Sequence, residues 1–100
     1  MPVRFDLNQP TFQNDLIALE KAEVLAFLKT LRKLRQLEWD EIYHDPNLNW
    51  ERIVSRTGLD GEALHSIRIT QKCRAVVTRA GDLLRFISLH PDHDSAYKRQ

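Results

Sequence analysis

The chain has 100 residues, of which 42% are hydrophobic and 29% are charged, and its formal net charge is +1. This length suits one domain with one core, so we expect residues 1–100 to fold as a single unit, and the composition excludes a disordered chain. No apolar run approaches the ~20 residues of a membrane helix, and the charged N-terminus lacks the apolar stretch of a signal peptide. The single cysteine, Cys73, allows no internal disulfide. We therefore expect a cytoplasmic protein with no membrane partner.

The first forty residues predict a strand followed by helical structure. Val3, Phe5 and Leu7 alternate with charged residues and are bracketed by prolines, which is typical of a short strand at the edge of a sheet. Residues 16–37 contain no Gly or Pro, and their leucines recur at helical spacing. This pattern predicts one long amphipathic helix, or two helices with a break near residues 20–23.

The middle of the chain gives weaker signals. Trp39 and Tyr43 indicate a second short helix, and the turn residues around Pro46 are expected to end it. Residues 48–53 contain apolar anchors but no clear period, so we assign them no element. Residues 58–61, with two glycines, predict a loop.

After residue 64 the hydrophobic period changes from helical to two. Residues 65–70, 74–79 and 83–90 predict three strands, and the segments 71–73 and 80–82 are short enough for hairpin turns. The predicted fold class is therefore α+β, with an N-terminal strand and helices packed on one face of a C-terminal antiparallel β-sheet.

The register of the first hairpin decides which side chains share a face. A three-residue loop at 71–73 would pair Arg68 with Val76 and Thr70 with Arg74. This register would place apolar side chains on one face and polar side chains on the other. We favour it because the register of a strand pair follows the hydrophobic pattern. The apolar face, which would cover the long helix, would hold Ile67, Ile69, Ala75 and Val77, and the open face would hold Arg68, Thr70 and Arg74. A three-residue loop at 80–82 would add Ser88 and His90 to the arginine face.

The C-terminal part is the side of the molecule that could meet a polyanion. Residues 62–100 hold 7 basic against 4 acidic residues and three of the four histidines. Arg68 and Arg74 would repel each other on one open face unless an anion lies between them. The alternatives are an ordinary mixed surface and ion pairs with carboxylates such as Glu62, Asp92 or Asp94.

The segment SIRITQKCRAVV, from Ser66 to Val77, resembles the central hairpin of the RelE/ParE superfamily of bacterial toxins, and its YoeB and RelE branches most of all. In that family a basic strand and a polar turn lead into an arginine followed by apolar residues. Residues 87–97 are similar to the family's ending, with an apolar strand, a segment containing histidine or arginine, and a closing tyrosine. The order of the predicted elements also fits.

The resemblance implies a toxin that is neutralised by an antitoxin partner and regulates growth. RelE-like members cleave messenger RNA in the ribosomal decoding site, whereas ParE-like members poison DNA gyrase. Carried over, Arg74 contacts the scissile phosphate and completes a catalytic set with His90, His93 and Tyr97. Arg68 matches a basic strand position of the family and is expected to bind RNA. Lys72 and Lys98 are further candidate RNA-binding residues, with a surface charge as the alternative for both lysines.

The implied chemistry is attack of a 2′-hydroxyl on the neighbouring phosphate, without a cofactor. A histidine suits the proton transfers at neutral pH, and an arginine suits the charge of the pentacoordinate phosphorus. Cys73 stands where the family commonly has an aromatic residue or histidine, which favours a gyrase inhibitor or a catalytically silent binding module as alternatives. His90 and His93 with the neighbouring aspartates also resemble metal ligands. The intervening Pro91 and the lack of a distant ligand set argue against that assignment.

Overall fold

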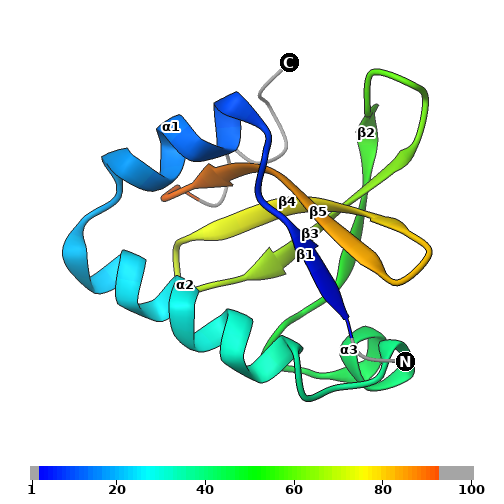
Figure 1. Ribbon diagram of the computed structural model, residues 1–100, viewed down its shortest axis with the longest axis horizontal. Helices are drawn as coiled ribbons and strands as arrows, with labels where there is room; N and C mark the ends of the chain where they lie inside the picture. The colour runs from blue at the N-terminus through cyan, green and yellow to red at the C-terminus, as the bar shows by residue number, and fades with distance from the viewer. Residues whose placement is uncertain (1–2, 93–100) are drawn as a thin grey trace.

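The computed structural model describes residues 3–92, so the predicted site residues His93, Tyr97 and Lys98 lie outside the described part. Five strands form one sheet in the order β1-β5-β4-β3-β2. The strands and helices, in chain order, are β1 (Arg4–Asp6), α1 (Pro10–Ala18), α2 (Lys21–Leu34), α3 (Trp39–His44), β2 (Glu51–Thr57), β3 (Ala63–Arg68), β4 (Arg74–Ala80) and β5 (Leu83–His90). Helices α1 and α2 lie along one face of the sheet (Figure 1). The α+β class is confirmed.

The long helical pattern is two helices. The backbone is extended at Leu19 and Glu20, which ends α1. Helix α2 then begins with a capping box, in which the Glu20 backbone N–H donates to the Glu23 carboxylate at 3.3 Å. Glu38 and Glu41 begin α3 in the same way, at 2.9 Å. Glutamate is not among the usual N-cap residues, so the sequence left the break as an alternative only.

The main core lies between the helices and the sheet. The rings of Phe12, Phe27 and Phe86 meet there, with centroids 5.4–5.5 Å apart, and Phe5 contacts Phe86 from the edge strand. A smaller apolar cluster lies on the opposite face of the sheet and consists of Ile53, Leu64 and Val76, with Ile87 packed against it. The sheet is therefore apolar on both sides, although only one side carries helices.

Two features of the sheet differ from the expected antiparallel arrangement. Strand β1 pairs in parallel with β5, so the sheet is mixed. Strand β2 pairs with β3 and forms the other edge, in the segment to which the sequence assigned no element. Only Ile53 on β2 is buried, which explains why no period-two pattern could be read there.

The first hairpin has a longer loop than expected. Arg68 pairs with Arg74, and Ile67 pairs with Ala75, so residues 69–73 form the loop and the predicted register is wrong by two residues. A shift of two preserves the faces, because side chains alternate with a period of two. The predicted sorting by polarity is therefore correct: Ile67, Ala75 and Val77 lie in the main core, and Arg68 and Arg74 lie on the other face.

Candidate functional site

Three of the predicted site residues form one row across three strands. Arg68 on β3 lies opposite Arg74 on β4, and Arg74 lies opposite His90 on β5. Lys72 is exposed in the loop between β3 and β4, beside this row. We call Arg68, Arg74 and His90 the Arg–His row.

A β-bulge brings His90 into the row. The β4–β5 turn is two residues long rather than three, with Ala80 paired to Leu83 and Gly81 in the left-handed region at φ 64°. Such a turn alone would place His90 on the helix face. Between Val77 and Val76 the register shifts, so that the extra residue Ile87 restores the alternation expected for Ser88 and His90. Bulges often re-aim side chains beside functional sites.

The guanidinium of Arg74 is fixed by its own turn. Its Nη1 donates hydrogen bonds to the backbone carbonyls of Thr70, Gln71 and Cys73 at 2.9, 3.1 and 3.2 Å. These bonds orient the side chain from a rigid strand, and bonds from a charged donor are stronger than those between neutral groups. Arg74 therefore has a structural task as well as any chemical one.

The row is not an open surface. Arg74 is 5% exposed and His90 is 2% exposed, so the expectation of an open polar face is wrong at these two positions. The reason lies partly in the apolar cluster on this face and in the arginine's bonds to its own turn. A ligand can reach both side chains only if this part of the face opens.

Arg68 differs from Arg74 because its guanidinium has no hydrogen bond within residues 3–92. The side chain is half-buried, and no carboxylate in the same range forms an ion pair with it. The expected alternative of a Glu62 ion pair is absent, because the Glu62 carboxylate accepts a bond from the Asp60 backbone N–H at 3.2 Å. Two arginines directly opposite each other destabilise a sheet, so their placement favours an anion between them.

Further polar groups lie close to the row, and among them Ser88 was expected on the arginine face. Ser88 Oγ and His90 Nε2 are 2.8 Å apart, and this bond fixes the ring. Ser66 is 1% exposed and pairs with Glu51 on β2, which places a carboxylate on the same face. Glu51 was missed because β2 itself was missed. The Asp15 carboxylate of α1 accepts a hydrogen bond from the Leu89 backbone N–H at 3.0 Å, at a point on β5 beyond its pairing with β1. This bond anchors the end of β5 directly before His90.

Cys73 is buried beside the row and is no nucleophile. Burial first, and then the nearby Glu23 carboxylate, raise the pKa of its thiol to about 11, whereas Arg74 acts in the opposite direction. The thiolate that a nucleophile requires is therefore scarce at neutral pH. Cys73 belongs to the main core.

This pKa predicts how stability depends on pH. The folded state holds the thiol proton more tightly than the unfolded state, where the pKa is near 9.0. The thiol's contribution to stability is complete below about pH 9 and is lost as the pH rises toward 11, by up to roughly 3 kcal/mol for a shift of two units. Urea unfolding at pH 8 and pH 10.5 measures the loss. The Cys73→Ala variant should lose less stability over the same interval, and equal losses would contradict the assignment.

Comparisons with known proteins point to a fold rather than to a family. No family model and no curated protein sequence matches the chain. Among solved structures, a copper-bound mutant toxin from Helicobacter pylori has a similar fold, with a TM-score of 0.52 and 19% sequence identity. The similarity covers 93% of this chain and 97% of the other. The chain thus has a fold that is also found in a bacterial toxin.

Two further findings apply to the described part of the chain. No group of three or more histidine, cysteine, aspartate or glutamate side chains within residues 3–92 is placed to hold a metal ion. No helix in that part is long and apolar enough to span a bilayer.

Proposed function

We propose that the protein is the toxin of a toxin–antitoxin pair of the RelE/ParE type and that it cleaves messenger RNA on the ribosome. The observation that carries the proposal is the Arg–His row, on a fold shared with a bacterial toxin. Two arginines opposite each other suit a phosphate, and a histidine beside them suits proton transfer to the leaving oxygen.

In this proposal each residue of the row has one task. Arg74, held by three carbonyls, stabilises the negative charge that develops on the phosphorane, because a fixed donor needs no reorganisation during the reaction. Arg68, without such bonds, grips the phosphate in the ground state. His90, with its ring fixed by Ser88, donates a proton to the leaving 5′-oxygen. Lys72 contacts the RNA backbone from the adjacent loop.

A second candidate is a binding module of the same fold without catalysis, such as a DNA gyrase inhibitor. The burial of Arg74 and His90 favours it, because a silent module would need neither side chain to be accessible. In the ribonuclease Arg68 would bind the scissile phosphate, whereas in a silent binding module it would have no part in RNA cleavage. This difference provides the test.

Replacing Arg68 by alanine separates the candidates. The variant should lower mRNA cleavage on purified ribosomes by about tenfold or more, because it loses a charge-assisted contact to phosphate. The same variant should fold as stably as the wild type, or a few tenths of a kcal/mol more stably, because it removes like-charge repulsion across the strands. Cleavage assays and urea unfolding give both values. A cleavage rate equal to that of the wild type would contradict a contact between Arg68 and the phosphate.

An antitoxin segment is the expected protein partner. A groove beside α2 is lined by Lys29, Arg32 and Lys33 together with the apolar side chains of Ala26 and Ile69. These residues suit an amphipathic acidic segment that docks as a helix in a groove. The groove reaches Ile69 in the loop whose carbonyls hold Arg74, so an occupant would lie close to the row.

Co-expression with the product of a short adjacent reading frame should yield a co-purifying complex and relieve growth arrest. Charge reversal at Lys29 and Arg32 together should weaken that complex by at least tenfold, measured by calorimetry, because it places like charges against an acidic partner. Replacing Arg35, at the C-cap of the same helix, by glutamate is the matched control, since Arg35 does not line the groove. Equal weakening by the control would argue against this docking site.

A further inference from the structure

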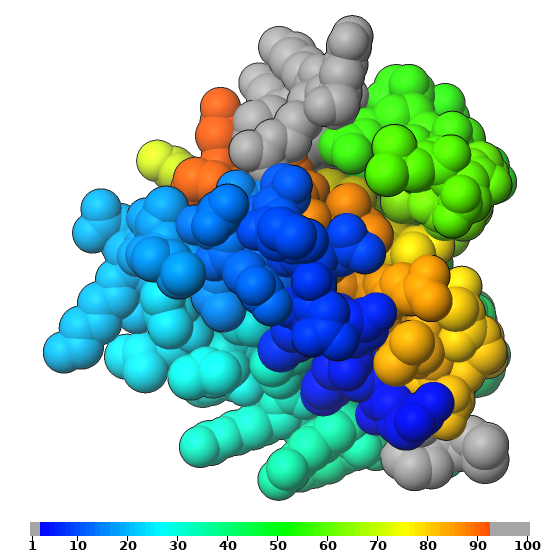
Figure 2. Space-filling model, turned by 45° about the horizontal axis from the view of Figure 1, so that its top comes forward, coloured from blue at the N-terminus to red at the C-terminus, as the bar shows by residue number. Residues whose placement is uncertain are grey.

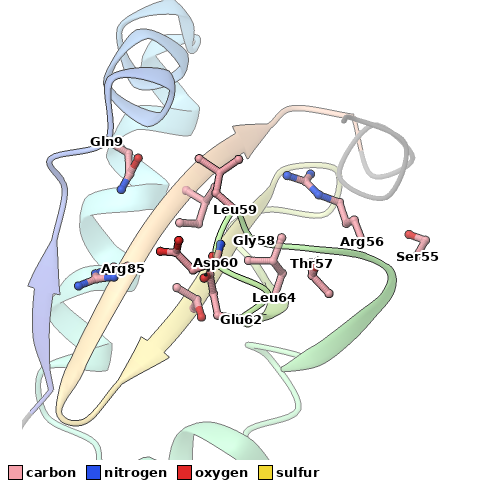
Figure 3. A pocket seen from close by; sticks show the side chains of 12 residues that line it. Gln9, Ser55, Arg56, Thr57, Gly58, Leu59, Asp60, Glu62, Leu64 and Arg85 are labelled. Atoms are coloured by element: carbon pink, nitrogen blue, oxygen red, sulfur yellow. Dashed lines mark hydrogen bonds between the residues drawn. The ribbon is translucent and has the colours of Figure 1, made fainter.

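A hollow of about 490 Å³ lies on the same face of the sheet as the Arg–His row, beyond the small apolar cluster. Leu64, Thr78 and Ile87 form its floor, and the loop of residues 58–62 forms one wall. In Figure 3, Leu59 and Asp60 of this loop lie over the sheet, and Arg85 on β5 borders the hollow. Figure 2 shows the β2–β3 hairpin (green) projecting beside the orange residues of β5.

The wall of the hollow is a fixed loop. The Gly58 backbone N–H donates to the Glu62 carbonyl at 2.9 Å, and the Glu62 carboxylate accepts the Asp60 N–H. That carboxylate occupies the space where a side chain at Gly58 would lie, so a larger residue there would displace the Glu62 side chain. By contrast, the Leu59 side chain is fully exposed, and the Asp60 carboxylate makes no hydrogen bond or ion pair within residues 3–92. The loop thus presents an apolar group and an acceptor that the fold itself does not use.

The charges of the hollow differ from those of the row. Arg56 and Arg85 are balanced by Asp60 and Glu62, whereas the row carries two arginines opposite each other. A balanced lining over an apolar floor suits a flat, uncharged group with a polar edge. It disfavours a phosphate, which the two carboxylates would repel.

The spacing allows one ligand to occupy both places. Thr78 in the hollow is four residues along β4 from Arg74, roughly 13 Å at the rise of a strand. An RNA strand with a phosphate at the row can therefore place a nearby base in the hollow.

We propose that the hollow is a base-binding subsite, which receives a nucleobase of the RNA strand whose phosphate lies at the Arg–His row. This inference rests on the proposed function. The base packs against Leu64, Ile87 and Leu59, and its edge meets charged groups. Proteins read unpaired RNA bases in this way, by packing and by hydrogen bonds to the Watson–Crick edge.

Guanine is the base that fits the lining best. The Asp60 carboxylate can only accept hydrogen bonds, and guanine presents neighbouring N–H donors on its Watson–Crick edge. Guanine O6 is an acceptor for an arginine. The Nε of Arg85 is held by Asp6 at 3.3 Å, which orients the guanidinium.

Titration of the full chain with the four nucleosides, which carry no phosphate, tests the subsite directly. Guanosine should shift the amide signals of Thr57, Gly58 and Asp60 in ¹H–¹⁵N spectra more strongly than uridine does. Asp60→Ala should weaken guanosine binding about tenfold, as expected for loss of a hydrogen bond to a charged group. Asp40→Ala, at an exposed aspartate on α3, should leave it unchanged. Absence of shifts at these amides, or equal affinity in Asp60→Ala, would overturn the proposal.

A second readout separates this inference from the proposed function. In ribosomal cleavage, Asp60→Ala should lower the rate about tenfold at sites with guanine near the cut, and much less at other sites, so that the base preference is lost. Guanosine binding without any RNA cleavage by the wild type would refute the ribonuclease and leave the base subsite standing. Cleavage with an unchanged pattern in Asp60→Ala would refute the subsite alone. Loss of antitoxin binding in Asp60→Ala, with nucleoside affinity unchanged, would instead assign the hollow to the antitoxin and also refute it.

Discussion

Replacing Arg74 by alanine should lower mRNA cleavage by about 10²–10³-fold and abolish growth arrest on induction. Arg74 is the residue of the Arg–His row that is most rigidly held, because three backbone carbonyls fix its Nη1. In the proposed reaction its charge is therefore in place before the negative charge develops on phosphorus. Arg74→Lys should restore little, because an ammonium group cannot reproduce the planar contact with two oxygens. Rates on purified ribosomes and growth after induction measure both effects.

The bonds of Arg74 to its turn require a control for folding. Arg74→Ala removes the donor for the carbonyls of Thr70, Gln71 and Cys73, so some loss of stability accompanies the substitution. Unfolding experiments and antitoxin binding must show that the variant is folded at the assay temperature. Lys72→Ala, in the same loop, serves as the matched control, with a cleavage rate lowered much less. A folded Arg74→Ala protein that still arrests growth would contradict the proposed role.

Replacing Phe86 by alanine should give the largest loss of stability, about 3–5 kcal/mol. Phe86 is fully buried, and its ring meets those of Phe5, Phe12 and Phe27, which joins the edge strand and both long helices to the sheet. Urea unfolding measures the loss. Ile17→Ala is the control, because Ile17 is 82% exposed and should change stability by less than about 0.5 kcal/mol. A loss below about 1 kcal/mol for Phe86→Ala would show that the phenylalanine cluster is not the centre of the core.

The sequence predicted the elements whose pattern reflects burial on one side. Strand β5 has the expected bounds, β4 differs from its expected bounds by one residue, and α3 lies where Trp39 and Tyr43 indicated. The failures have physical causes. Strand β2 buries only Ile53, so it shows no alternation, and the helix break depends on a capping box made by two glutamates. The parallel pairing of β1 with β5 is a tertiary arrangement that no local pattern encodes.

The sequence predicted which face of the sheet carries Arg68, Arg74 and His90, and it did so for different reasons in the two arginines and in the histidine. The faces of Arg68 and Arg74 followed from polarity, which survives a register error of two residues. His90 was expected on that face through a three-residue turn, whereas the structure combines a two-residue turn with a bulge at Ile87. Neither the burial of the row nor the carboxylate of Glu51 could be read from the sequence. The burial depends on tertiary packing and on the bonds of Arg74 to its own turn, and the place of Glu51 depends on how β2 joins the sheet. The roles of His93, Tyr97 and Lys98 stay predictions, since these residues lie outside the described part.

The central proposal is RNA cleavage at the Arg–His row, and mapping of mRNA 5′ ends in cells tests it most directly. After induction of the wild type, new 5′ ends should accumulate inside translated coding regions. They should be greatly reduced for Arg68→Ala, which we expect to fold as stably as the wild type. Translation inhibitors that block ribosome loading should remove them. Growth arrest with intact messenger RNA and broken chromosomal DNA would contradict the proposal and identify gyrase as the target.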